Sequence, residues 1–223
     1  MFYPEKMTLI RPHDRVLEIG PGAAPHHRSN AFLELKFETN KERISQRGNV
    51  YQEPNFGKRP VHYYDGGRFP FQDGEFDYVI CSHVVEHVVD PQSFLNEIFR
   101  VGGGRGYLEY PLATYEYLYN FHVHLHFVKF DFVRKTLYYL PKCDTELSQF
   151  AAINSLFYKT LECGWDDLIA SNKKLFFEGF EFTQPFDIEK TRDFEKLVPS
   201  HAFVVAKRPL RRLFDRIANK IGL

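Results

Sequence analysis

Short runs of aliphatic and aromatic residues recur along the chain and alternate with polar or glycine-rich segments. The run at residues 15–19 is the clearest, because Gly20, Pro21 and Gly22 follow it directly. Runs of this length between turn residues predict buried strands. The other runs that predict strands lie at residues 31–37, 61–64, 76–81, 106–110 and 202–206.

Residues 91–101 carry a helical pattern instead. Asp90 precedes the pattern as a capping residue, Pro91 occupies its first turn, and Gly102 follows its last apolar position. The apolar stripe of this helix consists of Phe94, Leu95, Ile98 and Phe99. Strands that alternate with helices indicate a parallel sheet covered on both faces. Ligands of such sheets bind beyond the carboxyl ends of the strands, so the loops there are where functional residues are expected.

Composition and charge narrow the class of protein. The chain has 223 residues, 43% hydrophobic and 26% charged, which suits one globular domain rather than a disordered or disulfide-scaffold protein. Its 29 basic residues balance 29 acidic ones, so a nucleic acid is not the expected partner. No apolar run approaches the roughly 20 residues that cross a bilayer. The first residues lack a signal-peptide pattern and the 3 cysteines form no paired spacing, so we expect a cytoplasmic protein.

Four segments of the chain follow one another in an order that is typical of one family of proteins. They are VLEIGPG at 16–22, FLELKF at 32–37, YYDGGRFPF at 63–71 and FDYVICSHVVEHVVDPQSFLNEIFRV at 76–101. Together they resemble the class I S-adenosylmethionine-dependent methyltransferases. The resemblance implies S-adenosyl-L-methionine as cofactor and an α/β fold, a Rossmann-like three-layer sandwich around a mostly parallel seven-stranded sheet. The short distance from Gly22 to Glu34 predicts that the first helix of this fold is shortened or lost.

The first of these segments combines two glycines with an acidic residue inside a strand that is predicted to be buried. Gly20 and Gly22 leave no side chains where the chain leaves the strand, so a ligand can approach the backbone closely. Glu18 lies among Val, Leu and Ile, where a carboxylate is costly to bury unless something pairs with it. The resemblance implies that Glu18 holds the ammonium end of the cofactor, directly or through the loop.

Further cofactor contacts are expected from the ends of the next strands. Glu34 could accept hydrogen bonds from both ribose hydroxyls, with Glu38 as a second candidate. Asp65 matches the acid that accepts from the adenine amino group in many relatives, with Gly66 beside it, although an Asp-Gly turn is the competing interpretation. The residues expected to line the cofactor after the fourth strand are Ser82, His83 and His87.

The segment HVVEH also fits the zinc-peptidase pattern HxxEH through His83, Glu86 and His87. That chemistry needs both histidines on one face of a helix. Here the segment follows a strand, is rich in valine, and reaches a helix start only at Asp90, so we predict no metal ligand. A non-catalytic nucleotide-binding module is the other alternative. A nicotinamide-dinucleotide enzyme is disfavoured, because Pro25 stands where a third glycine is needed.

Three histidines alternate within FHVHLHFV, at His122, His124 and His126. If the segment is extended, all three lie on the same side. A metal-binding face, a substrate wall and purely local hydrogen bonding compete as explanations. The resemblance favours the substrate wall, because a similar HLxFF segment lies near the acceptor site in many relatives. We expect His83, His124 or His126 to act as the base for a hydroxyl acceptor on a small molecule or glycan.

The expected organisation is a methyltransferase domain at residues 1–206. An insertion at about 112–172 would bind or cover the acceptor, and its part 144–172 carries a helical pattern that predicts a lid or a helix over the sheet edge. Residues 174–182 and 200–208 would then form the closing strands. Residues 207–223 combine six basic residues with one acidic residue and apolar positions at helical spacing. This basic amphipathic helix could dock on the domain, form an oligomer contact or bind lipid at a membrane surface.

Overall fold

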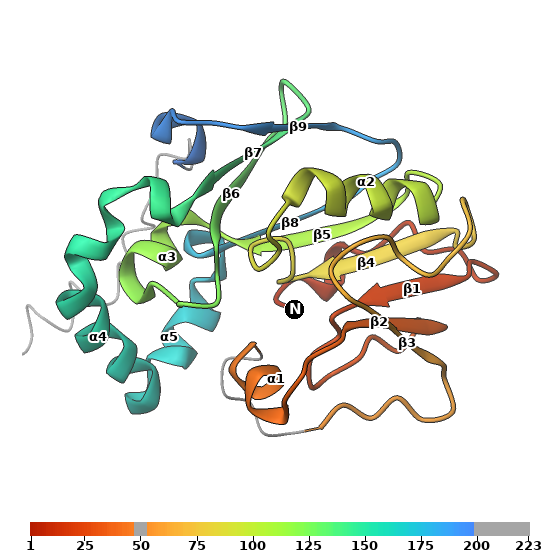
Figure 1. The fold of residues 1–223 in the computed structure, drawn as a ribbon, viewed down its shortest axis with the longest axis horizontal. Coiled ribbons are helices and arrows are strands. Elements are labelled where there is room, and N and C mark those ends of the chain that lie inside the picture. Colours follow the sequence, from red (N-terminus) through yellow and green to blue (C-terminus); the bar gives the residue numbers. More distant parts are fainter. Residues whose placement is uncertain (47–52, 199–223) are drawn as a thin grey trace, which may run out of the picture.

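A six-stranded sheet forms the centre of the molecule. The computed structural model describes residues 1–46 and 53–198. Within them the strands lie in the order β3-β2-β1-β4-β5-β8, with β8 alone antiparallel (Figure 1). Their bounds are β1 Val16–Ile19, β2 Ala31–Leu35, β3 Val61–Tyr64, β4 Tyr78–Ser82, β5 Gly106–Pro111 and β8 Phe177–Phe182. The mostly parallel Rossmann-like sheet is confirmed, but the described residues give it six strands rather than the predicted seven. The strand predicted at 202–206 lies outside the described residues.

The two faces of this sheet are covered by different parts of the chain. Helix α2, Pro91–Val101, packs on one face against a cluster that includes Leu17 and Val79. Its capping is as predicted, because the Asp90 carboxylate accepts hydrogen bonds from the backbone of Gln92 and Ser93. The opposite face buries Val16, Tyr78, Ile80 and Tyr107 against the N-terminal segment and later helices.

No helix joins β1 to β2 among the described residues 20–30, which form turns and loop. The predicted loss of the first helix is therefore confirmed. A short helix follows β2 instead, α1 at Asn40–Gln46, which the sequence did not indicate. Its surface is polar and none of its residues is buried, so no apolar periodicity marks it.

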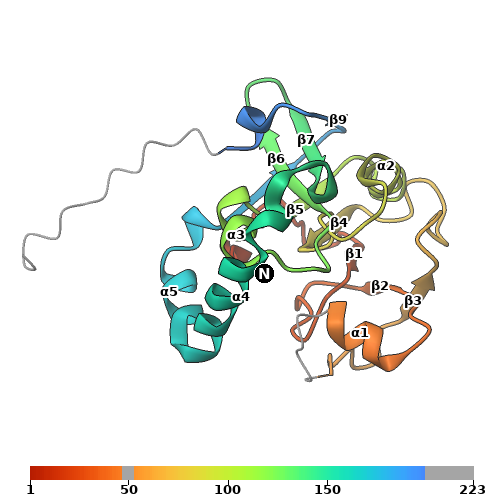
Figure 2. The ribbon, with the colours of Figure 1, turned by 60° about the vertical axis from the view of Figure 1, so that its left-hand side comes forward.

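The insertion is only partly helical. It contains α3 Ala113–Tyr119, α4 Ala151–Thr160 and α5 Asp166–Ser171, but also a hairpin of β6 His126–Asp131 and β7 Thr136–Pro141. Strand β9, Asp187–Lys190, pairs with β7 and completes a three-stranded second sheet (Figure 2). Phe130 and Leu137 of this sheet pack into the same core as Phe180. The hairpin therefore belongs to the core, and the predicted helical pattern is present only in the later part of the insertion, whose role as a lid stays a prediction.

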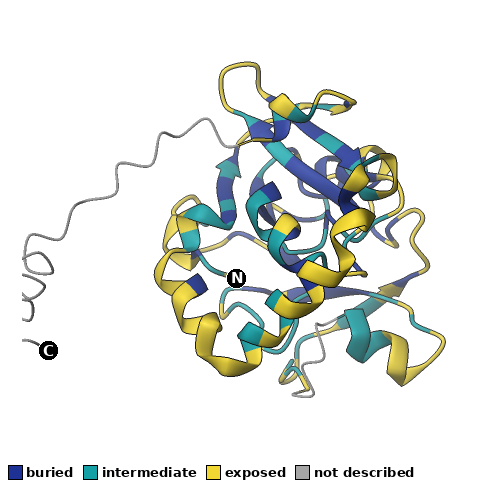
Figure 3. Ribbon diagram, turned by 90° about the vertical axis from the view of Figure 1, so that its left-hand side faces the viewer, coloured by how far each residue is buried: buried dark blue, intermediate teal, exposed yellow. Residues whose placement is uncertain are grey.

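Helices α4 and α5 bury less of their apolar stripe than expected. Phe157 and Leu161 pack against the core, whereas Ile153 and Leu156 are 51% and 66% exposed. Figure 3, in which these helices face the viewer, shows exposed residues along much of their length. None of the helices in the described ranges has both the length and the apolarity to span a bilayer. The predicted basic helix at 207–223 lies outside the described residues.

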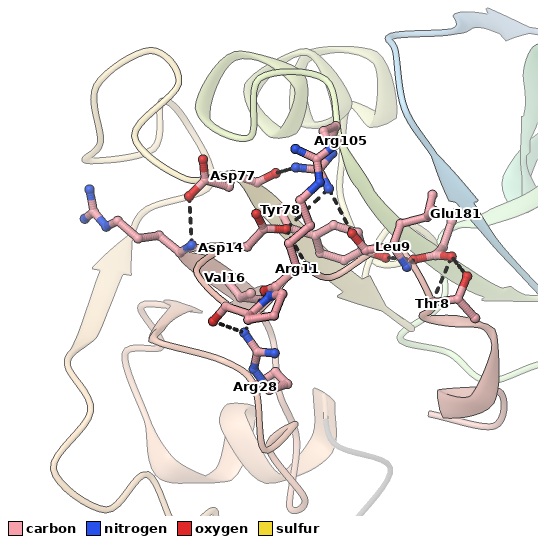
Figure 4. A network of polar contacts seen from close by, with 12 residues as sticks. Thr8, Leu9, Arg11, Asp14, Val16, Arg28, Asp77, Tyr78, Arg105 and Glu181 are labelled. Atoms are coloured by element: carbon pink, nitrogen blue, oxygen red, sulfur yellow. Dashed lines mark hydrogen bonds and ion pairs between the residues drawn. The ribbon is translucent and has the colours of Figure 1, made fainter.

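A polar network ties the N-terminal segment to the sheet edge where the parallel strands begin (Figure 4). Arg105, just before β5, donates to the backbone oxygen of Leu9 at 2.8 Å and to the Asp14 carboxylate at 3.3 Å. At the end of β8, the Glu181 carboxylate accepts from the backbone and hydroxyl of Thr8. These contacts occupy the edge opposite the strand carboxyl ends.

Candidate active site

Most of the predicted site residues lie where the parallel strands end. Strands β1 and β4 are neighbours, and the chain continues from β1 to β2 on one side and from β4 to β5 on the other. This reversal of direction between adjacent strands is the place where open α/β sheets bind ligands. The loops after β1 and β4 therefore meet at the expected position.

Gly20 and Gly22 both adopt left-handed backbone conformations, with φ of +57° and +60°. A Cβ atom at Gly20 would lie 2.8 Å from Cγ2 of Val84, so the loop after β1 packs directly against the loop after β4. A Cβ at Gly22 would meet no atom within 4 Å. The first glycine allows the close approach of two loops, and the second leaves open space beside the backbone.

Glu18 holds the loop that follows β1. Its side chain is buried, and Oε2 accepts hydrogen bonds from the backbone of His26 at 2.8 Å and from the Ser29 hydroxyl at 2.7 Å. Burial raises the pKa of Glu18 in spite of these two hydrogen bonds. The contacts favour the indirect form of its expected role, in which it shapes the loop.

Glu34 and Asp65 lie at the same edge of the sheet, on neighbouring strands. Glu34 of β2 pairs in register with Tyr63 of β3 and is buried, and Asp65 directly follows β3 and is exposed. The Asp65 carboxylate accepts from the backbone of Gly67 at 3.2 Å, with φ of +96° at Gly66. The Asp-Gly turn is therefore present, and it presents the carboxylate at a strand end. Their ribose and adenine roles stay predictions.

His83 lies between two buried carboxylates. Its Nε2 is 3.0 Å from Oε1 of Glu109, and its Nδ1 is 3.4 Å from Oε1 of Glu86. Although burial favours the neutral ring, these carboxylates raise the pKa of His83. Its φ of +56° is uncommon for a residue with a side chain, although histidine adopts this region more often than most residues do. Since both ring nitrogens face carboxylates, neither is left free to take a proton from an acceptor.

Glu109 is the main residue that the sequence analysis missed. It is fully buried in β5 and accepts from the Ser82 hydroxyl at 2.9 Å, the Tyr107 hydroxyl at 2.5 Å and the backbone of Tyr3 at 3.0 Å. It lies within GYLEYP as Glu18 lies within VLEI, an acid inside an otherwise apolar strand. Like Glu18, it is a carboxylate that is costly to bury unless something pairs with it, and this is the signal in the sequence that marks it.

Glu86 and His87 follow in the turn between β4 and α2. Glu86 is 0% exposed, and His87 Nε2 lies 3.8 Å from Oε1 of Glu86. The other nitrogen of His87, Nδ1, is 3.0 Å from Oε1 of Gln46 on α1. Burial lowers the pKa of His87 to about 4, so its imidazole is neutral at pH 7.

The three alternating histidines of the insertion have three different partners. Residues 121–125 form a turn rather than an extended segment, so the predicted common face is wrong. His122 contacts the Ser45 hydroxyl at 3.2 Å, His124 Nδ1 contacts Glu116 at 2.5 Å, and His126 Nε2 contacts the backbone oxygen of Val88 at 2.9 Å. Residues outside the segment cause this turn, because the main chain of Leu125 and His126 is hydrogen-bonded to the β4–α2 turn.

His124 is thereby brought to His87, with ring centroids 4.5 Å apart. The backbone amide of Leu125 donates to the backbone oxygen of Glu86 at 2.7 Å, which sets the register between the two loops. The Glu116 carboxylate that contacts His124 also accepts from Lys142 at 2.8 Å. Residues 83–87 form a turn rather than a helix, although His83 Nδ1 and His87 Nε2 both lie within 4 Å of Oε1 of Glu86. The helical geometry of the HxxEH peptidase pattern is absent from this segment.

A comparison with protein families agrees with the position of this site. A family model described as a methyltransferase domain matches residues 17–109, which span β1 to β5 and the loops just described. No curated protein matches the chain.

Solved structures similar to this chain include several S-adenosylmethionine-dependent methyltransferases. One from Thermotoga maritima, described as a possible histamine N-methyltransferase, is 23% identical, with a TM-score of 0.31 and 48% of each chain covered. One from Methanosarcina mazei is 17% identical, with a TM-score of 0.36, 59% of this chain covered and 73% of the other. The chain thus spans about half the length of the first of these relatives.

Proposed function

Because residues 17–109 belong to the class I S-adenosylmethionine-dependent methyltransferases, we propose that this protein methylates a hydroxyl group of a small molecule or glycan. The observation that carries the choice of a hydroxyl is the cluster of Glu86, His87 and His124, which forms where the turn after β4 contacts the turn at 121–125. A hydroxyl acceptor must lose a proton during methylation, and a neutral imidazole can take it.

The residues after β1 and β2 fit the cofactor. The open space beside Gly22 and the close packing at Gly20 leave a backbone surface for the amino acid end. Glu34, at the end of β2, would accept from the ribose hydroxyls, and Asp65 would lie beside the adenine. When bound, S-adenosylmethionine supplies a methyl group attached to a positively charged sulfur.

The remaining task of the protein is to position the acceptor, exclude water and move one proton. Of the three histidines expected as bases, His124 has the best contacts for this task. Its Nδ1 is held by Glu116, so that Nε2 is the nitrogen left to accept a proton. His126 uses its Nε2 at Val88, and this contact makes it a positioning residue for the insertion.

The insertion, which also contributes Glu116 and Lys142, would form the acceptor side of the site. Its assignment to acceptor binding rests on the contact between its turn at 121–125 and the β4–α2 turn. We retain a small molecule or glycan as the acceptor class and expect no nucleic acid partner, because the net charge is zero.

A glycine substitution tests whether the cofactor lies on the β1 loop. Gly20→Ala should weaken S-adenosylhomocysteine binding at least ~10-fold, because the new Cβ displaces Val84 and the left-handed backbone costs about 1 kcal/mol. Gly74→Ala is the matched control, since Gly74 has φ of +64° but lies before β4, at the opposite edge. Isothermal titration calorimetry measures both. Equal affinity of the two variants would place the cofactor elsewhere.

A second comparison tests the ribose contact. Glu34→Gln should weaken S-adenosylhomocysteine binding about 10-fold, the loss of one charge-assisted hydrogen bond. Glu38→Gln, four residues away at an exposed position, should leave the affinity unchanged. A larger loss from Glu38→Gln than from Glu34→Gln would reverse the assignment between the two candidates.

A further inference from the structure

The cluster of Glu86, His87 and His124 has the side chains of a metal site as well as those of a proton acceptor. One donor atom each from Glu86, His87 and His124 can be chosen such that all three lie within 4.8 Å of one another. We infer that these three side chains bind one divalent metal ion of the zinc type. No metal ligand is predicted from the HVVEH segment, because it follows a strand, is rich in valine and reaches a helix start only at Asp90. His124 lies in a remote part of the chain, and the sequence pattern does not connect it with this segment.

Glu86 provides the first independent observation. Its carboxylate is 0% exposed, yet neither oxygen receives a hydrogen bond of acceptable geometry within the described structure. The nearest nitrogens are His83 Nδ1 at 3.4 Å and His87 Nε2 at 3.8 Å. Burying a carboxylate without hydrogen bonds costs several kcal/mol. A bound cation would offset that cost at this position.

The two histidines provide the second observation. Each contacts an oxygen through Nδ1: His87 meets the Gln46 amide at 3.0 Å, and His124 meets the Glu116 carboxylate at 2.5 Å. In metal sites the ligating histidine commonly donates its other N–H to an outer carboxylate or carbonyl, which fixes the ring and its tautomer. With both Nδ1 atoms acting as donors, both Nε2 atoms are left as ligands.

The frame around these ligands is built from main-chain and buried contacts. The backbone oxygen of Glu86 accepts from Leu125 at 2.7 Å and from His126 at 3.2 Å, and Lys142 lies 2.8 Å from Glu116. Neighbouring ligands of a tetrahedral zinc ion lie about 3.4 Å apart, given metal–ligand distances of about 2.1 Å. The 3.8 Å between Glu86 and His87 therefore needs only a small contraction on binding.

The donor set also indicates the class of ion. Two imidazole nitrogens and one carboxylate oxygen suit Zn²⁺ and similar transition metals better than Mg²⁺, which prefers oxygen ligands. Three protein ligands leave a coordination position for an exchangeable ligand. The role of the ion rests on the proposed function: an acceptor hydroxyl bound there would lose its proton more easily, with solvent water as the proton acceptor. His124 would then hold the ion that activates the hydroxyl, instead of taking the proton itself.

Metal binding can be measured on the full chain without an acceptor. After chelation and dialysis, titration with ZnCl₂ should show one ion per chain, and Co²⁺ should give the visible absorption of a site with nitrogen ligands. Glu86→Gln and His124→Gln should each weaken Zn²⁺ binding at least ~10-fold. His122→Gln, from the same turn, is the matched control and should bind as the wild type does.

Three outcomes would overturn the inference. They are no stoichiometric Zn²⁺ binding by the wild type, unchanged binding by Glu86→Gln and His124→Gln, or binding that is lost in His27→Gln. The last would place the ion at the neighbouring pair His26 and His27, whose ring centroids are 4.4 Å apart. Calorimetry with S-adenosylhomocysteine on the same samples separates the two proposals. Cofactor binding without Zn²⁺ binding removes the metal site alone, and the converse removes the methyltransferase assignment alone.

Discussion

Replacing Glu109 with glutamine should lower the free energy of unfolding by about 3 kcal/mol, because both carboxylate oxygens are needed. Oε1 accepts from the backbone of Phe2 at 2.7 Å and from the Ser82 hydroxyl at 2.9 Å. Oε2 accepts from the backbone of Tyr3 at 3.0 Å and from the Tyr107 hydroxyl at 2.5 Å. Whichever way the amide of a glutamine is turned, its NH₂ group faces donors. Urea denaturation measures the change.

Glu18→Gln is the matched control for this prediction. Glu18 is also a buried acid in a parallel strand, but both of its hydrogen bonds are accepted by the same oxygen, Oε2. A glutamine can present its carbonyl oxygen there, so the unfolding free energy should change by less than about 1 kcal/mol. If the two variants were equally destabilised, burial of an acid, rather than the number of donors it serves, would govern the loss.

The difference in stability between the wild type and Glu109→Gln should depend on pH. Burial alone favours the protonated form of Glu109, but the His83 ring, 3.0 Å from Oε1, and the hydrogen bond from Tyr107 lower its pKa from 4.5 to about 2. A folded-state pKa below the unfolded one stabilises the fold above pH 4.5, and that contribution is lost as the pH falls from about 4.5 to about 2. The shift corresponds to about 3 kcal/mol. The gap in stability between wild type and Glu109→Gln should therefore narrow over this range, and a constant gap would contradict the assignment.

His124→Gln should reduce methyl transfer by at least ~100-fold, the usual scale for losing a group that assists proton removal. The affinity for S-adenosylhomocysteine should stay within about twofold, because the expected cofactor contacts lie after β1, β2 and β3. The measurement is transfer of a radiolabelled methyl group to the best acceptor among sugars and phenols. Full activity of the variant would exclude His124 from hydroxyl activation.

His122→Gln controls for disturbance of the turn at 121–125. The His122 ring contacts the Ser45 hydroxyl and is directed to a different partner from that of His124, so the variant should keep its turnover. A chelator then separates the two roles of His124. If the imidazole takes the proton, activity should survive chelation, whereas a metal-bound hydroxyl should lose its activation when the ion is removed.

Local patterns in the sequence were sufficient for much of the fold. The run at 15–19 with its two glycines predicted β1 and the loop after it, and Asp90 with Pro91 predicted the start of α2. These features depend on interactions between residues close in the chain, so a single sequence contains them. The distance from Gly22 to Glu34 likewise indicated that the first helix is missing. The hydrophobic runs also placed Glu34 and Asp65 at strand ends, since a strand ends where its run of apolar residues ends.

The tertiary structure alone decided which side chains of the site meet. His124 reaches His87 only because Leu125 is hydrogen-bonded to the backbone of Glu86, a contact between segments remote in sequence. The same packing turned residues 121–125 away from the extended form that their alternation suggested, and it gave Glu109 donors from the N-terminal segment, β4 and β5. Periodicity reports which face of an element is buried, but it carries no information about the partner that buries it.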